Sequence, residues 1–187
     1  MGYDIHRSDG KGPLRLGGVA IPSSRGLSGH SDADVLLHAI ADALFGAIGA
    51  PDLGEQFPPG DPRYRKVDSR LFVRQAIAQV RRQGFCVGNV DATVIAEKPT
   101  LIGYKQKMAK GIGQLLDVDA TRVSVKAKST EGFSPGRRGI AAHVVVLLKR
   151  SPVAAAFSRQ QKQRKAHRFV AITKLRPRRF FASSAGK

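Results

Sequence analysis

Two segments far apart in the sequence carry residues that could bind a metal ion. The stretch "GYDIH" places Asp4 and His6 two residues apart, and side chains with that spacing point to the same face of an extended strand. In "DVLLHAIAD", a helix would put Asp34 one turn before His38 and Asp42 one turn after it. One carboxylate and two imidazoles form a ligand set that zinc accepts, and three protein ligands leave a fourth position open. A histidine at a helix edge can equally be an ordinary hydrogen-bonded group, so both interpretations stay open.

Two further segments have residue types suited to phosphate. In "GHSDAD" the small residues let the backbone approach a ligand closely, and His30 and Ser31 could donate hydrogen bonds to phosphate oxygens. The same residues could instead form a simple capped start of a helix. In "KAKSTEG" an expected strand ends in Ser129, Thr130 and Glu131. Hydroxyls beside a carboxylate suit a diphosphate bridged by Mg²⁺, and the alternative is a polar strand end.

The spacing of apolar residues predicts the elements that hold these segments. A helix is expected over residues 31–49, with Ser31 or Asp32 as its N-cap. The following stretch, residues 51–64, contains four prolines and is expected to be an ordered loop without an element of its own.

The rest of the chain alternates between helical and extended patterns. A second amphipathic helix is expected over residues 67–84, capped by Asp68 or Ser69. A third helix, a strand pair and three longer strands are expected at residues 104–117, 13–22, 86–98, 122–130 and 140–150. Helices that alternate with strands indicate an α/β (α+β) sandwich, with a mixed sheet covered by helices on one face.

Composition limits the class of protein. Cys86 is the only cysteine among 187 residues, which excludes an internal disulfide and a cysteine-based zinc site. No apolar run approaches the length of a membrane span, and no signal pattern precedes residue 30. We therefore expect a cytoplasmic protein of a bacterium, with the plastid stroma as the less favoured alternative.

The net charge of +18 is concentrated at the C-terminal end. Residues 149–187 hold 12 Lys or Arg and no Asp or Glu. We expect a folded domain at residues 1–149 and a basic, disordered extension at residues 150–187. Binding of nucleic acid or an anionic surface by this extension is the less favoured alternative.

Several segments together resemble one family. "GYDIHR", "LGGVAIP", "GHSDADVLLHAIADALFGAIGAPDLGEQFP", "GNVDATVIAEKP", "VSVKAKSTEG" and "GRRGIAAHVVVLL" follow the order and approximate spacing of the 2-C-methyl-D-erythritol 2,4-cyclodiphosphate synthases of the non-mevalonate isoprenoid pathway. The resemblance covers residues 1–149. It implies a homotrimer with its sheets around the threefold axis and its active sites between subunits. It also implies conversion of 4-diphosphocytidyl-2-C-methyl-D-erythritol 2-phosphate to the 2,4-cyclodiphosphate and CMP.

The resemblance also implies roles for individual residues. Asp4, His6 and His38 would bind one Zn²⁺ per subunit, and Glu131 would bind Mg²⁺ or Mn²⁺ with the diphosphate. His30 and Ser129 match the positions of transition-state stabilisers. The remaining positions would bind the substrate, and they are Ser31, Asp34, Asp52, Leu53, Gly54, Phe57, Asp61, Ala96, Thr100, Leu101, Ile102, Lys128, Thr130, Phe133 and Arg137.

The sequence departs from the family pattern in several places. Pro59 replaces an acidic residue of the pocket loop, Thr100 replaces a lysine of the cytidine loop, and the segment after Glu131 is about two residues shorter. Arg137 and Arg138 are both candidates for the diphosphate-binding arginine. These departures leave a catalytically impaired homologue that binds cytidine diphosphate ligands as an alternative.

Overall fold

Four strands form one mixed sheet in a computed structural model that describes residues 1–132 and 139–152. In spatial order the strands are β1 (Gly2–Arg7), β6 (Gly139–Arg150), β4 (Phe85–Ile95) and β5 (Val123–Lys128). β6 runs antiparallel to both of its neighbours, whereas β4 and β5 are parallel. A parallel pair needs a crossover connection, which here contains the third long helix. The predicted mixed sheet is confirmed.

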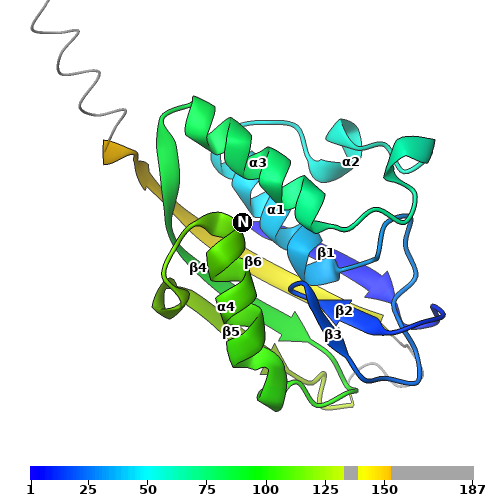
Figure 1. Cartoon of the computed structure of the whole chain (residues 1–187). Coiled ribbons are helices and arrows are strands. Elements are labelled where there is room, and N and C mark those ends of the chain that lie inside the picture. Colours follow the sequence, from blue (N-terminus) through cyan, green and yellow to red (C-terminus); the bar gives the residue numbers. More distant parts are fainter. Residues whose placement is uncertain (133–138, 153–187) are drawn as a thin grey trace, which may run out of the picture. The chain divides into compact units, whose positions relative to one another are not determined.

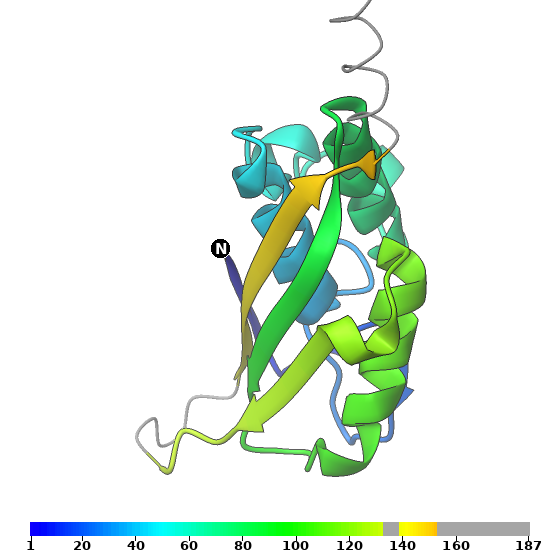
Figure 2. The ribbon, with the colours of Figure 1, turned by 90° about the vertical axis from the view of Figure 1, so that its left-hand side faces the viewer.

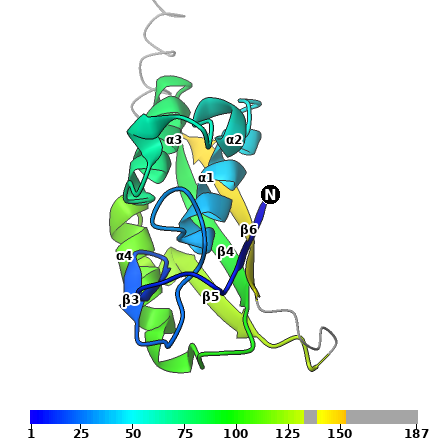
Figure 3. The same ribbon diagram turned by 90° about the vertical axis from the view of Figure 1, so that its right-hand side faces the viewer.

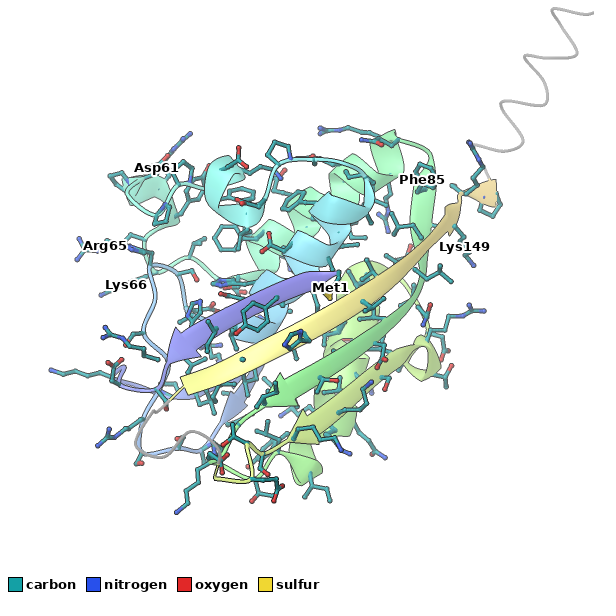
Figure 4. All side chains as sticks on the ribbon, turned by 180° about the vertical axis from the view of Figure 1, so that it is seen from behind. Met1, Asp61, Arg65, Lys66, Phe85 and Lys149 are labelled. Atoms are coloured by element: carbon teal, nitrogen blue, oxygen red, sulfur yellow. The ribbon has the colours of Figure 1, made fainter. Side chains whose placement is uncertain are left out.

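Three helices cover one face of this sheet. They are α1 (Val35–Ala47), α3 (Arg70–Arg82) and α4 (Lys105–Leu116). Figures 2 and 3, which view the molecule from opposite sides, show the helices in one layer and the sheet in another. Figure 4 shows the sheet from behind, where no helix of the described residues lies over it. The expectation of helices on one face is confirmed (Figure 1).

The central helix α1 is buried on nearly all sides because it lies between the sheet and α3. Its sequence is accordingly apolar around most of its circumference, which is typical of a helix enclosed by other elements. The expected N-cap at Ser31 or Asp32 is wrong. The helix begins at Val35, and the Asp34 carboxylate accepts the Leu37 N–H at 3.1 Å.

The first strand packs closely on α1. A Cβ atom added to Gly2 would lie 2.0 Å from the Ala39 carbonyl oxygen, so only glycine allows this approach. Side chains alternate along the strand, and Asp4 and His6 share the partly buried face with Gly2, whereas Tyr3 and Ile5 are exposed. The predicted common orientation of Asp4 and His6 is confirmed.

The smaller elements connect these layers. β2 (Leu14–Leu16) and β3 (Val19–Ile21) form the expected strand pair. Residues 51–64 hold a short helix, α2 (Leu53–Gln56), and a 3₁₀ turn (Pro62–Tyr64), so the expectation of a loop without elements is wrong. Asp52 and Asp61 cap these two turns through their carboxylates, which explains why so proline-rich a stretch is helical in places. Two more 3₁₀ turns lie at Ile102–Tyr104 and Ala120–Arg122.

The expected basic extension falls almost entirely outside the described residues. Residues Met1–Ser151 form one compact unit, and the state of residues 153–187 stays a prediction. None of the described helices is long and apolar enough to cross a membrane. The expected cytoplasmic location also stays a prediction.

Candidate functional site

The structure brings the three predicted metal ligands together. Asp4 and His6 come from β1 and His38 comes from α1. The Asp4 Oδ2 atom lies 2.9 Å from His6 Nε2 and 3.0 Å from His38 Nδ1, and the two ring nitrogens are 3.3 Å apart. Tetrahedral zinc with bonds of about 2.0–2.2 Å holds its ligand atoms roughly 3.3–3.6 Å apart. The donor atoms therefore fit a metal ion after a small outward movement.

Proximity changes how these groups titrate. Burial by itself would raise the pKa of Asp4, but hydrogen bonds to His38 and His6 outweigh burial and hold that pKa well below its usual range. Burial would likewise lower the pKa of His6, but its hydrogen bond to Asp4 and the charge of Asp4 raise it above the ordinary histidine value. Asp4 is therefore ionised at neutral pH, as a metal ligand must be.

A cavity of about 360 Å³ opens beside the three ligands. Six predicted site residues line it together with the ligands, and they are His30, Ser31, Asp52, Leu53, Gly54 and Phe57. Pro59, one of the departures from the family pattern, also lines the cavity. The cavity thus combines a metal-binding group, hydrogen-bond donors and an apolar wall, as small-molecule sites do.

Sequence reasoning missed several residues of this cavity. Asp42 lines it and accepts the Leu53 N–H at 2.7 Å, which fixes the start of α2. Burial raises the pKa of Asp42, although the Leu53 N–H opposes that effect. Tyr64 and Phe72 stack around Phe57 to form the apolar wall. The only signal for Asp42 in the sequence was its helical spacing from His38. No local pattern predicted the aromatic wall, because its residues come from separate elements.

Two predicted substrate-binding acids do not line the cavity. Asp34 is fully buried, and its carboxylate accepts the N–H groups of Gly17 at 2.9 Å and Gly18 at 2.6 Å as well as that of Leu37. Burial raises the pKa of Asp34 against the effect of these hydrogen bonds. The structure therefore gives Asp34 a structural position that joins the β2–β3 turn to α1. Asp61, labelled in Figure 4, pairs with Arg63 at 2.6 Å.

The other predicted site residues form a second group at the ends of β4 and β5. The Ala96 N–H donates to the Lys128 carbonyl at 2.8 Å, and Thr130 donates through its N–H to Glu97 at 2.5 Å. Ser129 donates to the Glu131 carboxylate. None of these residues lines the cavity beside Asp4.

Residues 96–102, which were predicted to hold the cytidine, continue from this group. Thr100 and Ile102 are exposed, whereas Leu101 is 3% exposed and belongs to the core. Phe133 and Arg137 lie outside the described residues. The predicted site residues therefore divide into two groups within one chain.

Known proteins resemble this chain in sequence and in fold. The 2-C-methyl-D-erythritol 2,4-cyclodiphosphate synthase of Geobacillus thermodenitrificans is 49% identical over 153 residues, which is 81% of this chain and 96% of that protein. The solved structure of a 2C-methyl-D-erythritol-2,4-cyclodiphosphate synthase in a CDP-bound form has a TM-score of 0.74 at 34% identity, covering 79% of this chain and 97% of that chain.

A longer protein matches over part of its length. The bifunctional IspDF from Campylobacter jejuni has a TM-score of 0.76 at 39% identity, covering 80% of this chain but 41% of that chain. Residues 1–149 match the YgbB family. Because the family model spans most of the chain and the relatives are up to about half identical to it, the chain belongs to the YgbB family.

Proposed function

We propose that this chain is a metal-dependent 2-C-methyl-D-erythritol 2,4-cyclodiphosphate synthase. It would convert 4-diphosphocytidyl-2-C-methyl-D-erythritol 2-phosphate to the 2,4-cyclodiphosphate and CMP. The observation that carries this proposal is the convergence of Asp4, His6 and His38 at a cavity of about 360 Å³. The identity of 49% to a named synthase supports the same assignment.

The reaction needs little covalent chemistry from the protein. A 2-phosphate oxygen of the substrate attacks the β-phosphorus, the bond from that phosphorus to the bridging oxygen breaks, and CMP leaves with this oxygen. The attacking phosphate, with a second pKa of about 6, is largely ionised at neutral pH. Catalysis then consists of positioning two anionic groups and offsetting their repulsion. A well-oriented intramolecular attack of this kind can lower the barrier by roughly 7–11 kcal/mol.

The residues of the cavity suit this task. Asp4, His6 and His38 would hold Zn²⁺, which when bound supplies positive charge beside the β-phosphate. His30 and Ser31 lie on the cavity wall and can donate hydrogen bonds to phosphate oxygens. Asp52 can accept hydrogen bonds from the hydroxyl groups of the sugar alcohol, and Phe57 provides an apolar surface for its methyl group.

We assign the second group of residues to the nucleotide end of the substrate. Glu131 would hold Mg²⁺ or Mn²⁺, and Lys128, Ser129 and Thr130 would face the diphosphate. Ala96, Thr100 and the backbone of Leu101 would contact the cytidine. Oxygen ligands on a carboxylate and on phosphates are those that these hard cations prefer.

A homotrimer would complete the site. The two groups of residues are separate in one chain, and the sheet face without helices exposes four large apolar side chains. These are Tyr3 at 46%, Ile5 at 58%, Val145 at 54% and Leu147 at 62% exposure. Packing of three such faces around a threefold axis would bury them. The second group of one subunit would then face the metal-binding cavity of its neighbour.

A CMP-release assay tests the function. Purified protein is expected to contain one zinc per chain and to release CMP when Mg²⁺ is present. His38→Ala is expected to lose both zinc and activity, while Asp117→Asn, a change of an exposed carboxylate at 86% side-chain exposure, keeps both. Thermal unfolding of both variants shows whether they fold. Zinc binding and ligand binding without CMP release would support the impaired homologue, and a fully active His38→Ala variant would refute the metal assignment.

A further inference from the structure

Ser69 stands at the N-cap position of α3 but does not cap the helix. Serine is among the preferred N-cap residues because its hydroxyl accepts a free N–H group of the first turn. Here the Ser69 side chain makes no such bond. The neighbouring Asp68 carboxylate accepts the Arg70 N–H at 2.9 Å instead. The Ser69 hydroxyl, which belongs to a fully buried residue, is therefore available for other contacts.

The hydroxyl is engaged with a metal-ligand histidine and with an acid. Ser69 Oγ lies 2.9 Å from His38 Nε2, the ring nitrogen that faces away from Asp4 and His6. The same hydroxyl donates to the Asp32 carboxylate. Asp32 is itself held by the Ser69 N–H and the Asp34 N–H, each at 3.3 Å. The carboxylate, the hydroxyl and the imidazole thus form one continuous chain of hydrogen bonds.

Counting protons fixes the direction of this chain. A serine hydroxyl has one proton, and a carboxylate only accepts. The Ser69 proton therefore goes to Asp32, which leaves the Ser69 oxygen as an acceptor for His38. His38 must then keep a proton on Nε2. When a metal ion replaces the proton that Nδ1 shares with Asp4, the neutral ring therefore has its lone pair on Nδ1. That nitrogen is the one 3.0 Å from Asp4 Oδ2 and 3.3 Å from His6 Nε2.

A second hydroxyl lies at the same place without changing this result. Ser31 Oγ is 3.0 Å from His38 Nε2 and 3.2 Å from Ser69 Oγ, and it accepts the Ala33 N–H at 3.1 Å. The Ser31 proton can go to Ser69 or to a ligand in the cavity that both Ser31 and His38 line. Ser69, by contrast, is not part of the cavity lining.

We propose that Ser69 and Asp32 are positioning residues that hold His38 in its metal-binding tautomer and orientation. This inference rests on the proposed zinc site and adds to it two residues that do not touch the metal. Partners of a metal-bound histidine raise its basicity and fix its ring, and their loss typically weakens metal binding about 10–100-fold. The Ser69 hydroxyl, which does not cap α3, thus supports the metal site.

The test measures zinc affinity by competition with a chromophoric chelator. Ser69→Ala removes the buried acceptor of His38 Nε2 that is linked to Asp32, and leaves only the Ser31 hydroxyl. It is expected to weaken zinc binding by about 10–100-fold. Asp32→Asn keeps an oxygen acceptor but removes the charge, so a smaller loss is expected. Asp68→Ala is the matched control, because it removes the side chain that does cap α3 and does not contact His38. The zinc affinity of Asp68→Ala is expected to stay within about twofold of wild type. This change is much smaller than the loss expected for Ser69→Ala.

A spectroscopic readout separates positioning from simple destabilisation. Cobalt substituted for zinc reports ligand geometry through its visible absorption, and this spectrum is expected to change in Ser69→Ala but not in Asp68→Ala. Wild-type zinc affinity and an unchanged cobalt spectrum in Ser69→Ala would overturn the inference while leaving the proposed function intact. Equal losses in Ser69→Ala and Asp68→Ala would also overturn it, since both would then act through α3. If wild-type protein bound no zinc, the proposed function itself would fail.

Discussion

At the scale of single residues, the metal ligands change one another. Neither Asp4 nor His6 is unusual alone, but within 2.9 Å each stabilises the charged form of the other. The pKa of His6 is raised and that of Asp4 is lowered. In the metal-free protein a proton therefore competes with a metal ion for the His6 ring.

This competition predicts a pH dependence of zinc binding. Because the pKa of His6 is raised above its ordinary value of 6.5, zinc affinity should begin to fall at a higher pH than for a typical histidine site. Metal binding must displace that proton. Chelator competition between about pH 8 and about pH 5.5 should show affinity decreasing as pH falls. A flat profile over this range would contradict the raised pKa.

The same shifts have opposite effects on the stability of the metal-free protein. His6, with a raised folded-state pKa, contributes stability below its unfolded pKa of about 6.5, and this contribution is lost as pH rises through the folded value. Asp4, with a lowered pKa, contributes stability above about pH 4 that is lost in acid. Protein whose metal has been removed by a chelator should therefore be most stable between about pH 4 and the raised pKa of His6.

Asp34 illustrates a residue whose importance is structural. Asp34→Ala would leave the buried N–H groups of Gly17 and Leu37 and the partly buried N–H of Gly18 without their acceptor. Loss of an N-cap costs about 1 kcal/mol, and each unsatisfied buried group costs about 1–3 kcal/mol. We expect a loss of roughly 3 kcal/mol or more in the free energy of unfolding, measured by urea titration. Asp119→Ala, which removes an exposed N-cap and leaves no buried N–H group unpaired, should cost no more than about 1 kcal/mol.

At the scale of elements, the site depends on how β1 packs on α1. Two metal ligands lie on the strand and the third on the helix, so the distance between the ligand atoms depends on how closely the two elements pack. The close approach at Gly2 fixes one end of this contact, with Ala39 and Ala43 as the facing residues of α1. Small residues on both elements are what allow the ligands to meet.

Gly2→Ala should therefore weaken both stability and metal binding. The new methyl group would lie 2.0 Å from the Ala39 carbonyl oxygen, so the strand must move away from α1. Overpacking of this kind typically costs about 1–3 kcal/mol. Gly103→Ala is a suitable control, because no atom lies within 4 Å of its new Cβ. Unfolding and zinc titrations should show losses for Gly2→Ala only, and equal behaviour of the two variants would contradict the packing argument.

Sequence periodicity identified every long element but not how each one starts. The helix at Val35–Ala47 was expected from residue 31, because Ser31 and Asp32 are good capping types. In the structure Ser31 contacts His38, and Asp32 accepts from Ser69. Capping propensity is a local property, whereas the partner of Asp32 lies more than 30 positions away in the sequence. The cap at Asp34 could not be chosen without those contacts.

At the scale of the whole molecule, the exposed sheet face predicts assembly. Leu147→Glu would place a charge among exposed apolar side chains that the proposed trimer buries. We expect sedimentation to show dissociation and CMP release to fall, because each site would lose its second group. Zinc binding should persist, since all three ligands come from one chain. Gln106→Glu, on an exposed position of α4, should stay trimeric, and an active monomeric Leu147→Glu would refute the shared site.

The basic extension offers a separate test. Removal of residues 153–187 is expected to leave zinc content and CMP release unchanged, because the compact unit ends at Ser151. If the extension binds nucleic acid, the full chain should bind RNA with strong salt dependence and the shortened chain should not. Loss of CMP release on truncation would instead show that the extension contributes to catalysis.

By itself the sequence determined the ligand types, the alternation that puts Asp4 and His6 on one strand face, and the fold class with its helices on one side of a sheet. These follow from local periodicity and from resemblance. Only the tertiary structure decided that His38 meets the other two ligands within 3.3 Å, that Asp34 is a buried cap outside the cavity, and that Ser69 serves His38. The physical reason is that such contacts join His38 to residues 31 and 32 positions away and Asp34 to residues 16 and 17 positions away. Packing between elements, which no local pattern encodes, sets those distances.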